Sequence, residues 1–155
     1  MSVCLDSAGY NSSRNQQNET AMDYQYKTDP ETVDWEALKA ALVAGKFDNG
    51  RTPDEYRRSA AGSHLNVYAF HGDEIIGNGR IISDGVCNAY IVDIWTAPAH
   101  RRRGIASRIL LMLKESVPGQ HIYLQTDDAQ LLYRKAGFED QPHGMSTVVG
   151  SWLNR

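Results

Sequence analysis

The segment "HRRRGIASRIL", residues 100–110, places an arginine cluster and a glycine directly before an amphipathic pattern. The apolar side chains after Gly104 recur at helical spacing, so we expect a helix that begins at this glycine. The first N–H groups of a helix have no partner within it, and the helix dipole adds partial positive charge there. A glycine lets an anion approach these groups, and arginines add donors. The stretch predicts a phosphate-binding turn, and a solvated charge run is the alternative.

A second residue of chemical interest is Asp93, which interrupts the apolar run "AYIVDIW". A charged side chain in such a strand is costly unless it is paired or functional. Asp93 is therefore a candidate functional group; the alternatives are an aspartate on the solvated face of the sheet, or one paired with an arginine. Asp84 is a weaker acidic candidate, because an Asp-Gly turn explains it without catalysis.

Metal sites and catalytic nucleophiles are not expected from the residue inventory. The five histidines are scattered, and neither HExxH nor GxSxG occurs. The two cysteines, Cys4 and Cys87, form no CxxC pair, so neither a disulfide framework nor a zinc site is predicted. A reducing, cytoplasmic setting fits this cysteine usage.

The elements that must position these groups follow from periodicity and turn signals. Alternation predicts a first strand at residues 24–28. Two short helices should follow, one capped by Asp34 and one started by the capping box "TPDE", residues 52–55. Apolar runs broken by "HGDE" and "SDG" then predict an antiparallel meander with strands at 65–70, 75–83 and 89–96.

The second half of the chain continues this order of elements. After the helix that begins near Gly104, a stop at Pro118-Gly119 precedes a strand "HIYLQT". A helix is expected at residues 129–136, followed by a strand that opens at Phe138 and a final apolar strand near "STVVGSWL".

Length and composition limit the classes of protein to consider. The 155 residues, 41% hydrophobic, suit one domain, which we place at residues 23–155 after a flexible polar extension at residues 1–22. The net charge of −3 argues against a protein that coats nucleic acid. No apolar run approaches the length of a membrane span, and the N-terminus lacks the apolar core of a signal peptide.

Two motifs together carry a family resemblance. Arg101-x-x-Gly104-x-Ala106 resembles the Arg/Gln-x-x-Gly-x-Gly/Ala signature of the GCN5-related N-acetyltransferases (GNAT), whose loop holds the pyrophosphate of acetyl-CoA. "LLYRKAGFED", residues 131–140, resembles their second motif, a tyrosine-bearing helix that ends before Gly-Phe. "SDGVCNAYIVDIW" further resembles a subgroup with plant serotonin-type and uncharacterised bacterial members. The resemblance implies an α/β (α+β) GNAT fold, a mixed, mostly antiparallel sheet of six to seven strands flanked by about four helices.

The resemblance also implies acetyl-CoA as the acetyl donor. In the family, the strand before the arginine turn splays at a bulge, so that its backbone N–H groups face the cofactor and one can polarise the thioester carbonyl. Where the family often has an asparagine that contacts the pantetheine arm, this chain has Thr126, and we expect Asp127 and Asp128 to cap the next helix instead. The expected cofactor-binding residues are Ile94, Trp95, Thr96, Arg101, Arg102, Arg103, Gly104, Ile105, Ala106, Ser107, Thr126 and Ala129.

Acetyl transfer to an amine needs a neutral amine, a polarised carbonyl and a proton for the departing thiolate. An alkylamine has a pKa of about 10.4, so a base must remove its proton at neutral pH. The resemblance implies Asp93 as this base, directly or through water, and Tyr133 as the general acid. Without the motif, Tyr133 would be interpreted as a core aromatic of a short helix.

The sequence thus predicts an acetyl-CoA-dependent N-acetyltransferase that acts on a primary amine of a small molecule by direct attack. The alternatives are a protein or peptide N-acetyltransferase and a non-catalytic acyl-CoA-binding module. Trp35 and Asp84 are predicted to shape the acceptor pocket. Neither a nucleic acid nor a membrane is an expected partner. A homodimer is the assembly that the resemblance suggests, through a C-terminal strand carrying Val148, Val149 and Trp152.

Overall fold

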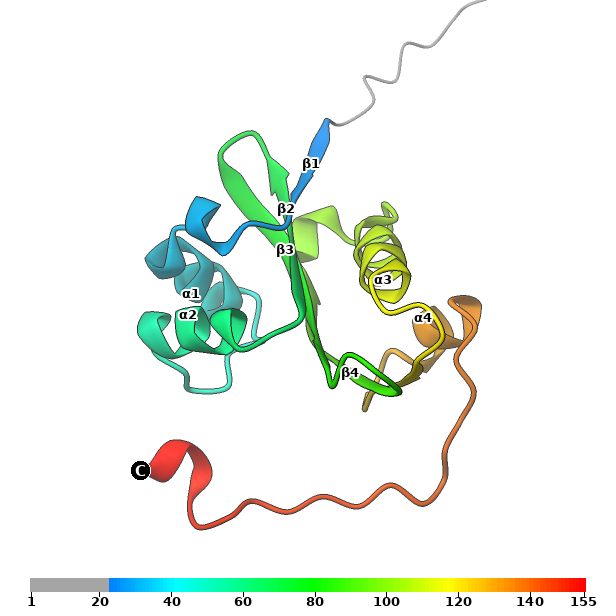
Figure 1. Ribbon diagram of the computed structural model, residues 1–155. Helices are drawn as coiled ribbons and strands as arrows, with labels where there is room; N and C mark the ends of the chain where they lie inside the picture. The colour runs from blue at the N-terminus through cyan, green and yellow to red at the C-terminus, as the bar shows by residue number, and fades with distance from the viewer. Residues whose placement is uncertain (1–22) are drawn as a thin grey trace, which may run out of the picture.

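The computed structural model describes residues 23–155, whose centre is a five-stranded sheet with the order β1-β2-β3-β4-β5 (Figure 1). The first four strands pair antiparallel with their neighbours, and β5 pairs parallel to β4. The strands are β1 (Tyr24–Lys27), β2 (Leu65–His71), β3 (Glu74–Ser83), β4 (Asn88–Thr96) and β5 (His121–Tyr123).

Helices cover both faces of this sheet (Figure 1). One face carries α1 (Trp35–Ala44) and α2 (Pro53–Ala61), and the other carries α3 (Ile105–Glu115) and α4 (Gln130–Lys135). Three short 3-10 turns complete the described elements, namely η1 (Pro30–Thr32), η2 (Pro98–His100) and η3 (Trp152–Asn154). Among residues 23–155, none of the helices combines the length and the apolar character that crossing a bilayer requires.

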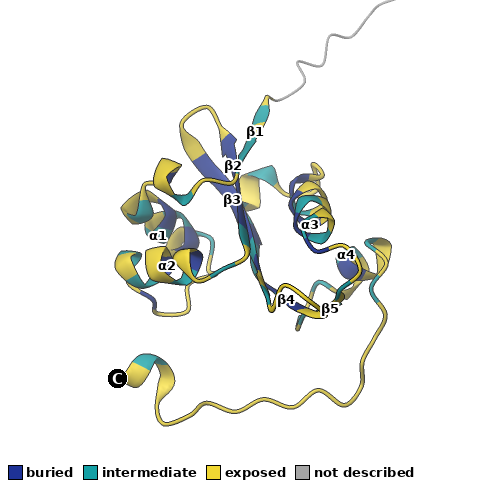
Figure 2. Cartoon of the chain, in the orientation of Figure 1, coloured by how far each residue is buried: buried dark blue, intermediate teal, exposed yellow. Residues whose placement is uncertain are grey.

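Buried residues lie on the strands and on the helices of both faces (Figure 2), and the sheet divides their side chains into two clusters. The larger cluster joins one face of the strands to α3, with Ile109 and Leu113 fully buried. The smaller joins the other face to α1 and includes Trp95. Gly79 allows the close approach of α3, because a Cβ there would lie 2.7 Å from Cγ2 of Ile109. Successive side chains of a strand point to opposite faces of the sheet, so a strand can contribute side chains to both clusters.

Most of the predicted elements are confirmed, but the expected sheet of six to seven strands is wrong. The sheet has five strands, and within the described residues no strand begins at Phe138 or forms near "STVVGSWL". Pro142 cannot donate to a ladder, and glycines at 144 and 150 weaken a strand further. The last segment instead runs away from β5 and ends beside α2 (Figure 1), so Val148 and Val149 lie exposed outside any strand.

The predicted extension at residues 1–22 lies outside the described residues. The two predicted helix starts on the α1–α2 side have the expected caps. The side chain of Asp34 accepts a hydrogen bond from the N–H of Ala37, and Thr52 and Glu55 form a reciprocal capping box at the start of α2. Both helices therefore begin where the sequence predicted.

We expect the change Thr52→Ala to lower the free energy of unfolding by about 1 kcal/mol, because the N–H of Glu55 loses its acceptor. Thr52→Ser keeps the hydroxyl and should stay close to the original chain. Urea denaturation of the three proteins measures the difference. Equal stability of all three would show that the capping box contributes nothing here.

Candidate active site

A bulge in β4 creates the first feature of the site. The register between β3 and β4 shifts between Asn78 and Arg80, so that one more residue of β4 is accommodated at this point. Asp93 lies at the shift with φ +58°, a left-handed conformation that aspartate adopts more readily than most residues. The bulge was expected from the resemblance, and its presence re-aims the side chain of Asp93.

Beyond the bulge, one edge of β4 is open. The parallel pairing with β5 ends at Tyr90 and Tyr123, and no other strand of the described residues pairs with this edge of β4. The backbone of residues 91–96 therefore offers hydrogen-bonding groups that the ladder with β5 does not use. The predicted positions Ile94, Trp95 and Thr96 all lie on this segment.

The arginine-glycine turn leads from the end of this open edge into α3. Arg101 donates from Nε to the carbonyl of Thr96 over 3.2 Å, which ties the turn to the strand. Arg102 and Gly104 both have positive φ, +61° and +82°, and Gly104 is the N-cap of α3. No side chain of the described part of the chain caps this helix, and its first turn contains no acidic residue. The amide groups at this end therefore remain suited to an anion.

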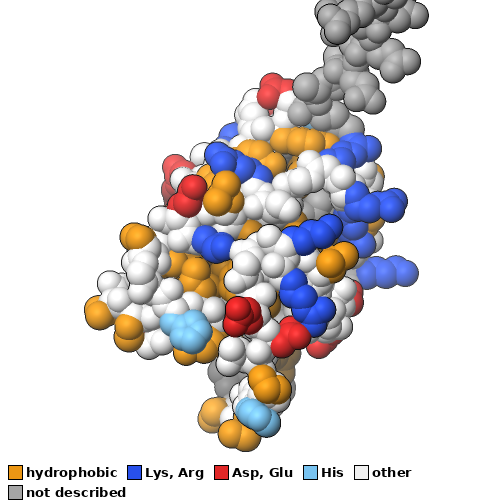
Figure 3. Space-filling view, turned by 90° about the vertical axis from the view of Figure 1, so that its right-hand side faces the viewer, with side chains coloured by type: hydrophobic (Ala, Val, Ile, Leu, Met, Phe, Trp, Pro, Cys, Tyr) orange, Lys and Arg blue, Asp and Glu red, His pale blue; other side chains and the backbone are white. Residues whose placement is uncertain are grey.

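Positive charge surrounds this helix end. The side chains of Arg101, Arg102 and Arg103 are exposed, as is that of Arg108 one turn into α3. Figure 3 shows Lys and Arg side chains gathered in the upper half of the face that includes α3. Arg103 donates to the hydroxyl of Tyr24 on β1, which fixes part of the turn against the sheet. The arrangement provides donors and field for a phosphate-bearing ligand.

The remaining expected cofactor residues differ in accessibility. Ile105 is buried under the turn, whereas Ala106 is partly exposed and Ser107 is exposed. Ile94 packs into the larger cluster, and Trp95 is buried in the smaller one. Their side chains thus serve the core, and only their backbone groups can contact a ligand at the open edge.

The expected capping of α4 by Asp127 and Asp128 is wrong. Oγ1 of Thr126 accepts the hydrogen bond from the N–H of Ala129 at 3.0 Å, and neither aspartate side chain caps α4. A threonine three residues before the donating N–H makes the same bond as an aspartate without adding charge. Thr126 therefore orders the start of α4, and its hydroxyl still has a proton to donate.

Asp93 is held between two arginines that the sequence did not single out. Its Oδ1 lies 2.8 Å from Nη2 of Arg51, and its Oδ2 lies 2.6 Å from Nε of Arg80. The three side chains are only 16%, 7% and 18% exposed, respectively. The arginine-paired alternative for Asp93 is thus present in the structure, and both carboxylate oxygens are engaged.

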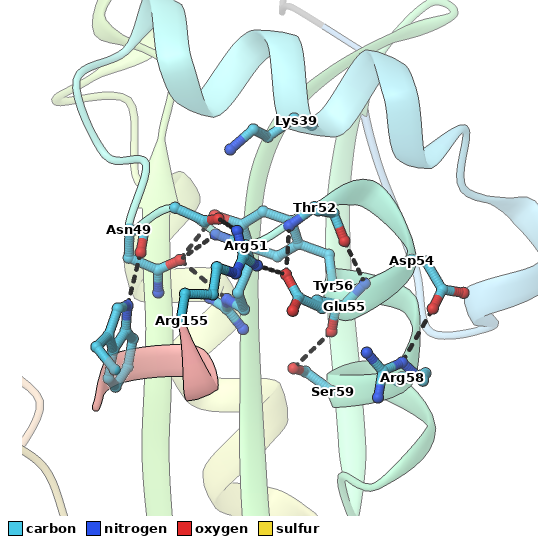
Figure 4. A network of polar contacts seen from close by, with 12 residues as sticks. Lys39, Asn49, Arg51, Thr52, Asp54, Glu55, Tyr56, Arg58, Ser59 and Arg155 are labelled. Atoms are coloured by element: carbon cyan, nitrogen blue, oxygen red, sulfur yellow. Dashed lines mark hydrogen bonds and ion pairs between the residues drawn. The ribbon is translucent and has the colours of Figure 1, made fainter. Parts of the chain in front are cut away.

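The loop that carries Arg51 is braced from several sides (Figure 4). The guanidinium of Arg51 lies 4.1 Å from the ring centre of Tyr56, and its Nε donates to Asn49 over 3.0 Å. The C-terminal segment reaches the same loop, where Nε1 of Trp152 donates to the carbonyl of Asn49, and Arg155 pairs with Glu55 in the first turn of α2. Arg51 is therefore fixed in orientation toward Asp93.

Tyr133 lies on α4, on the opposite side of the sheet from Asp93. Its side chain is buried, and its ring packs edge-on against Phe138 with the centres 5.9 Å apart. Burial, and to a lesser extent the charge of Asp128, raises the pKa of Tyr133 above 10. Within residues 23–155, no group forms a hydrogen bond with its hydroxyl. The phenol therefore carries its proton at neutral pH and can give it to a ligand.

Two cavities accompany these groups. A groove of about 820 Å³ runs along β5 and α4, and its lining includes Tyr133 and Thr126. A cavity of about 20 Å³ lies on the α1–α2 side and is lined by Trp35 and Asp93. Asp93 and Tyr133 therefore do not share a cavity. Asp93 and Tyr133 lie on opposite sides of the sheet, and the open edge of β4 lies between these two sides.

Of the two predicted acceptor residues, the structure places only Trp35 beside Asp93. Asp84 lies in an exposed turn, where its carboxylate accepts hydrogen bonds from the N–H groups of Val86, Cys87 and Asn88 at 2.8–3.1 Å. These bonds lower the pKa of Asp84 well below its usual range. The Asp-Gly turn explanation accounts for this residue.

Three further polar residues of this cavity escaped the sequence analysis, namely Asn66, Asn78 and Arg80. A signal existed, because each interrupts an apolar strand as Asp93 does. Asn66 pairs with Arg80, and Tyr68 pairs with Asn78, so the polar residues share the sheet face toward α1 and α2. The positions of the polar residues along β2 and β3 have a period of two, and this pattern could have predicted the polar face.

The chain is similar to known acetyltransferases in sequence and in fold. Residues 61–140 match the family model "Acetyltransferase (GNAT) domain". A Gibberella zeae protein named "Putative acetyltransferase FG08082" is 28% identical over 148 residues, covering 80% of this chain and 84% of that one. A GNAT family protein of Streptococcus pneumoniae has the same fold, with a TM-score of 0.69, 22% identity and coverage of 83% and 100%. A Clostridium acetobutylicum structure described with acetyl-CoA superimposes at a TM-score of 0.64, with 20% identity and coverage of 81% and 96%.

Proposed function

This chain belongs to the GNAT family of acetyltransferases, and we propose that it transfers the acetyl group of acetyl-CoA to a primary amine of a small molecule. Proteins of this family use acetyl-CoA. The observation that carries the proposal is the uncapped start of α3, which adjoins the open edge of β4. A diphosphate and an extended arm need these two features side by side.

The residues present fit this cofactor. The first N–H groups of α3 would hold the diphosphate, with Gly104 leaving room and the adjacent arginines adding charge. The backbone of residues 91–96 would hold the pantetheine arm by its unused hydrogen-bonding groups. When bound, acetyl-CoA supplies an acetyl group activated as a thioester.

Asp93 is the proposed base and Tyr133 the proposed acid. Asp93 takes the proton from the amine, directly or through water, so that nitrogen can form the new C–N bond. As the C–S bond breaks, Tyr133 would give its phenolic proton to the leaving sulfur, and one backbone N–H of β4 would stabilise the carbonyl oxygen. The second proton that the nitrogen loses would return to the phenolate of Tyr133 through water. The two groups can act together from opposite faces of the sheet because the β4 edge between them is open.

The arginines constrain how Asp93 can act. Arg51 and Arg80 each occupy one oxygen of Asp93 and leave less room for an ammonium beside the carboxylate. The proposed mechanism therefore includes an exchange, in which the substrate ammonium replaces a guanidinium beside Asp93. Direct attack then follows without a covalent enzyme intermediate.

We expect Gly104→Ala to weaken acetyl-CoA binding about tenfold or more, because the added Cβ lies where the diphosphate approaches. A Cβ at this position meets no protein atom within 4 Å, so the fold itself has room for it. Gly85→Ala is the matched control, since Gly85 also has φ near +80° and open space around it but lies in the Asp84 turn. Titration calorimetry with acetyl-CoA compares the two.

If the two glycine variants bound acetyl-CoA with equal affinity, the result would contradict the placement of the diphosphate at the start of α3. Release of free thiol from acetyl-CoA, measured with panels of amines and of peptides, tests the reaction itself. Release with small amines supports the proposal, whereas release only with peptides favours the protein-directed alternative. Binding of acetyl-CoA with no release would identify a non-catalytic module.

A further inference from the structure

The small cavity beside Asp93 has an unusual lining for the interior of a sheet protein. About 20 Å³ in volume, it lies between the sheet and the two helices α1 and α2. Its lining combines aromatic and aliphatic side chains with three charged groups and two amides. A space of this size admits one water molecule or one ammonium group. The charges and hydrogen-bonding groups of the cavity wall therefore determine which group can bind in the cavity.

The charges of the cavity wall do not balance. Arg51 and Arg80 contribute two positive charges, and Asp93 contributes one negative charge. The nearby carboxylates already have cations of their own, since Asp48 pairs with Lys39 and Glu55 pairs with Arg155. Among the residues that the structure describes, one positive charge is therefore left over in a largely buried position. Buried charge is stable only when paired, so the wall is complementary to an anion.

The two amides of the wall have unused hydrogen-bond acceptors. Nδ2 of Asn66 donates to the carbonyl of Ala60, and Nδ2 of Asn78 donates to the carbonyl of Asp93. These bonds fix which end of each amide is the oxygen. Both Oδ1 atoms are buried, with their residues 6% and 7% exposed, and neither has a hydrogen-bond partner within residues 23–155. Buried acceptors normally have a donor, so the wall is also complementary to N–H groups.

From these two features we propose that the acceptor substrate carries a carboxylate together with its primary amine, as a free amino acid does. This inference rests on the proposed acetyltransferase function and specifies its substrate class. The ammonium group enters the cavity and donates to the amide oxygens of Asn66 and Asn78 and to Asp93. The carboxylate takes the place of Asp93 on one of the two arginines, outside the narrow cavity.

The same exchange prepares Asp93 for its role as base. A substrate carboxylate that occupies Arg51 or Arg80 releases one oxygen of Asp93, and that oxygen then faces the substrate ammonium. An amine without a carboxylate brings a second surplus positive charge to a wall that already has one, and like charges repel. The wall therefore disfavours simple alkylamines, and the half-buried Trp35 at its lining contacts the rest of the acceptor.

The test compares acceptors that differ only at the carboxylate. Phenylalanine, phenylalaninamide and phenethylamine form one set, and leucine, leucinamide and 3-methylbutylamine form a second. Thiol release from acetyl-CoA gives kcat/KM for each. We expect the free acid to exceed both relatives by about tenfold or more in at least one set. The amide is the sharper control, because its amine has a pKa of about 8 and loses its proton more readily than that of the acid.

A variant arm tests the arginines. Arg51→Met should reduce the preference for the acid at least severalfold, whereas Arg51→Lys should retain part of it. Arg58→Met is the matched control, since Arg58 lies exposed on α2 and pairs with Asp54. Should Arg51→Met fail to fold, the lysine variant and the comparison of acceptors on the original chain still decide the question. The preferred carboxylate could belong to a free amino acid or to an acidic side chain of a peptide. Thiol release with peptide amides that begin with Asp or with Asn distinguishes these two sources.

The outcomes separate this inference from the proposed function. Preference for the free acids, reduced by Arg51→Met and unaffected by Arg58→Met, supports it. Turnover of the decarboxylated amines at equal or higher kcat/KM overturns it and leaves the acetyltransferase function standing. Preference for an acidic peptide over all free amino acids overturns the assignment to a free amino acid. Acetyl-CoA binding without turnover of any acceptor overturns both proposals.

Discussion

Tyr133→Phe is expected to lower kcat by about 10- to 10⁴-fold and to leave the affinity for acetyl-CoA nearly unchanged. The change removes only the hydroxyl, so the ring keeps its edge-on packing against Phe138. The leaving sulfur then has no positioned proton donor. Since burial raises the pKa of Tyr133, its phenol is protonated over the whole neutral range, and the loss should not depend on pH there.

Steady-state kinetics with calorimetry for acetyl-CoA measure both parts of this result. Tyr26→Phe is the matched control, because Tyr26 is a half-buried tyrosine on β1 that packs against the same cluster. Its kcat should stay within twofold of the original. A Tyr133→Phe variant with a similarly unchanged kcat would remove the acid role from this residue.

Asp93→Asn is expected to lower the free energy of unfolding by about 3 kcal/mol and kcat by about 10²- to 10⁴-fold. The amide leaves Arg51 and Arg80 without a counter-charge in a largely buried place. Asparagine is the suitable substitute, because it tolerates the positive φ of this position as aspartate does. Urea denaturation and thiol release measure the two effects separately.

Asp54→Asn is a closely matched control, since Asp54 also pairs with two arginines, Arg57 and Arg58, but is 58% exposed on α2. Its loss of stability should be much smaller, because water screens exposed ion pairs. The double change Asp93→Asn with Arg51→Met should recover part of the stability without recovering activity if Asp93 is the base. Recovery of both would make Asp93 a positioning residue.

The strands and α-helices of residues 23–117 could be predicted from local signals. Apolar runs and the turn signals between them predicted β2, β3 and β4 within two residues at each end, and the caps Asp34 and Thr52 predicted the starts of α1 and α2. These signals act within a few residues of the chain, so they survive without knowledge of the tertiary structure. The same reasoning failed after α4, where residues 138–153 have apolar side chains but also a proline and glycines.

The sequence by itself determined the arginine-glycine turn, the glycine that begins α3 and the tyrosine of α4, because each belongs to a contiguous motif. Only the tertiary structure decided the surroundings of Asp93. Arg51, Asn66 and Arg80 come from a loop and two strands, and they meet Asp93 through the register of the sheet and the packing of α1 and α2. Charge balance in a buried site depends on such distant groups, whereas spacing along the chain reports only near ones.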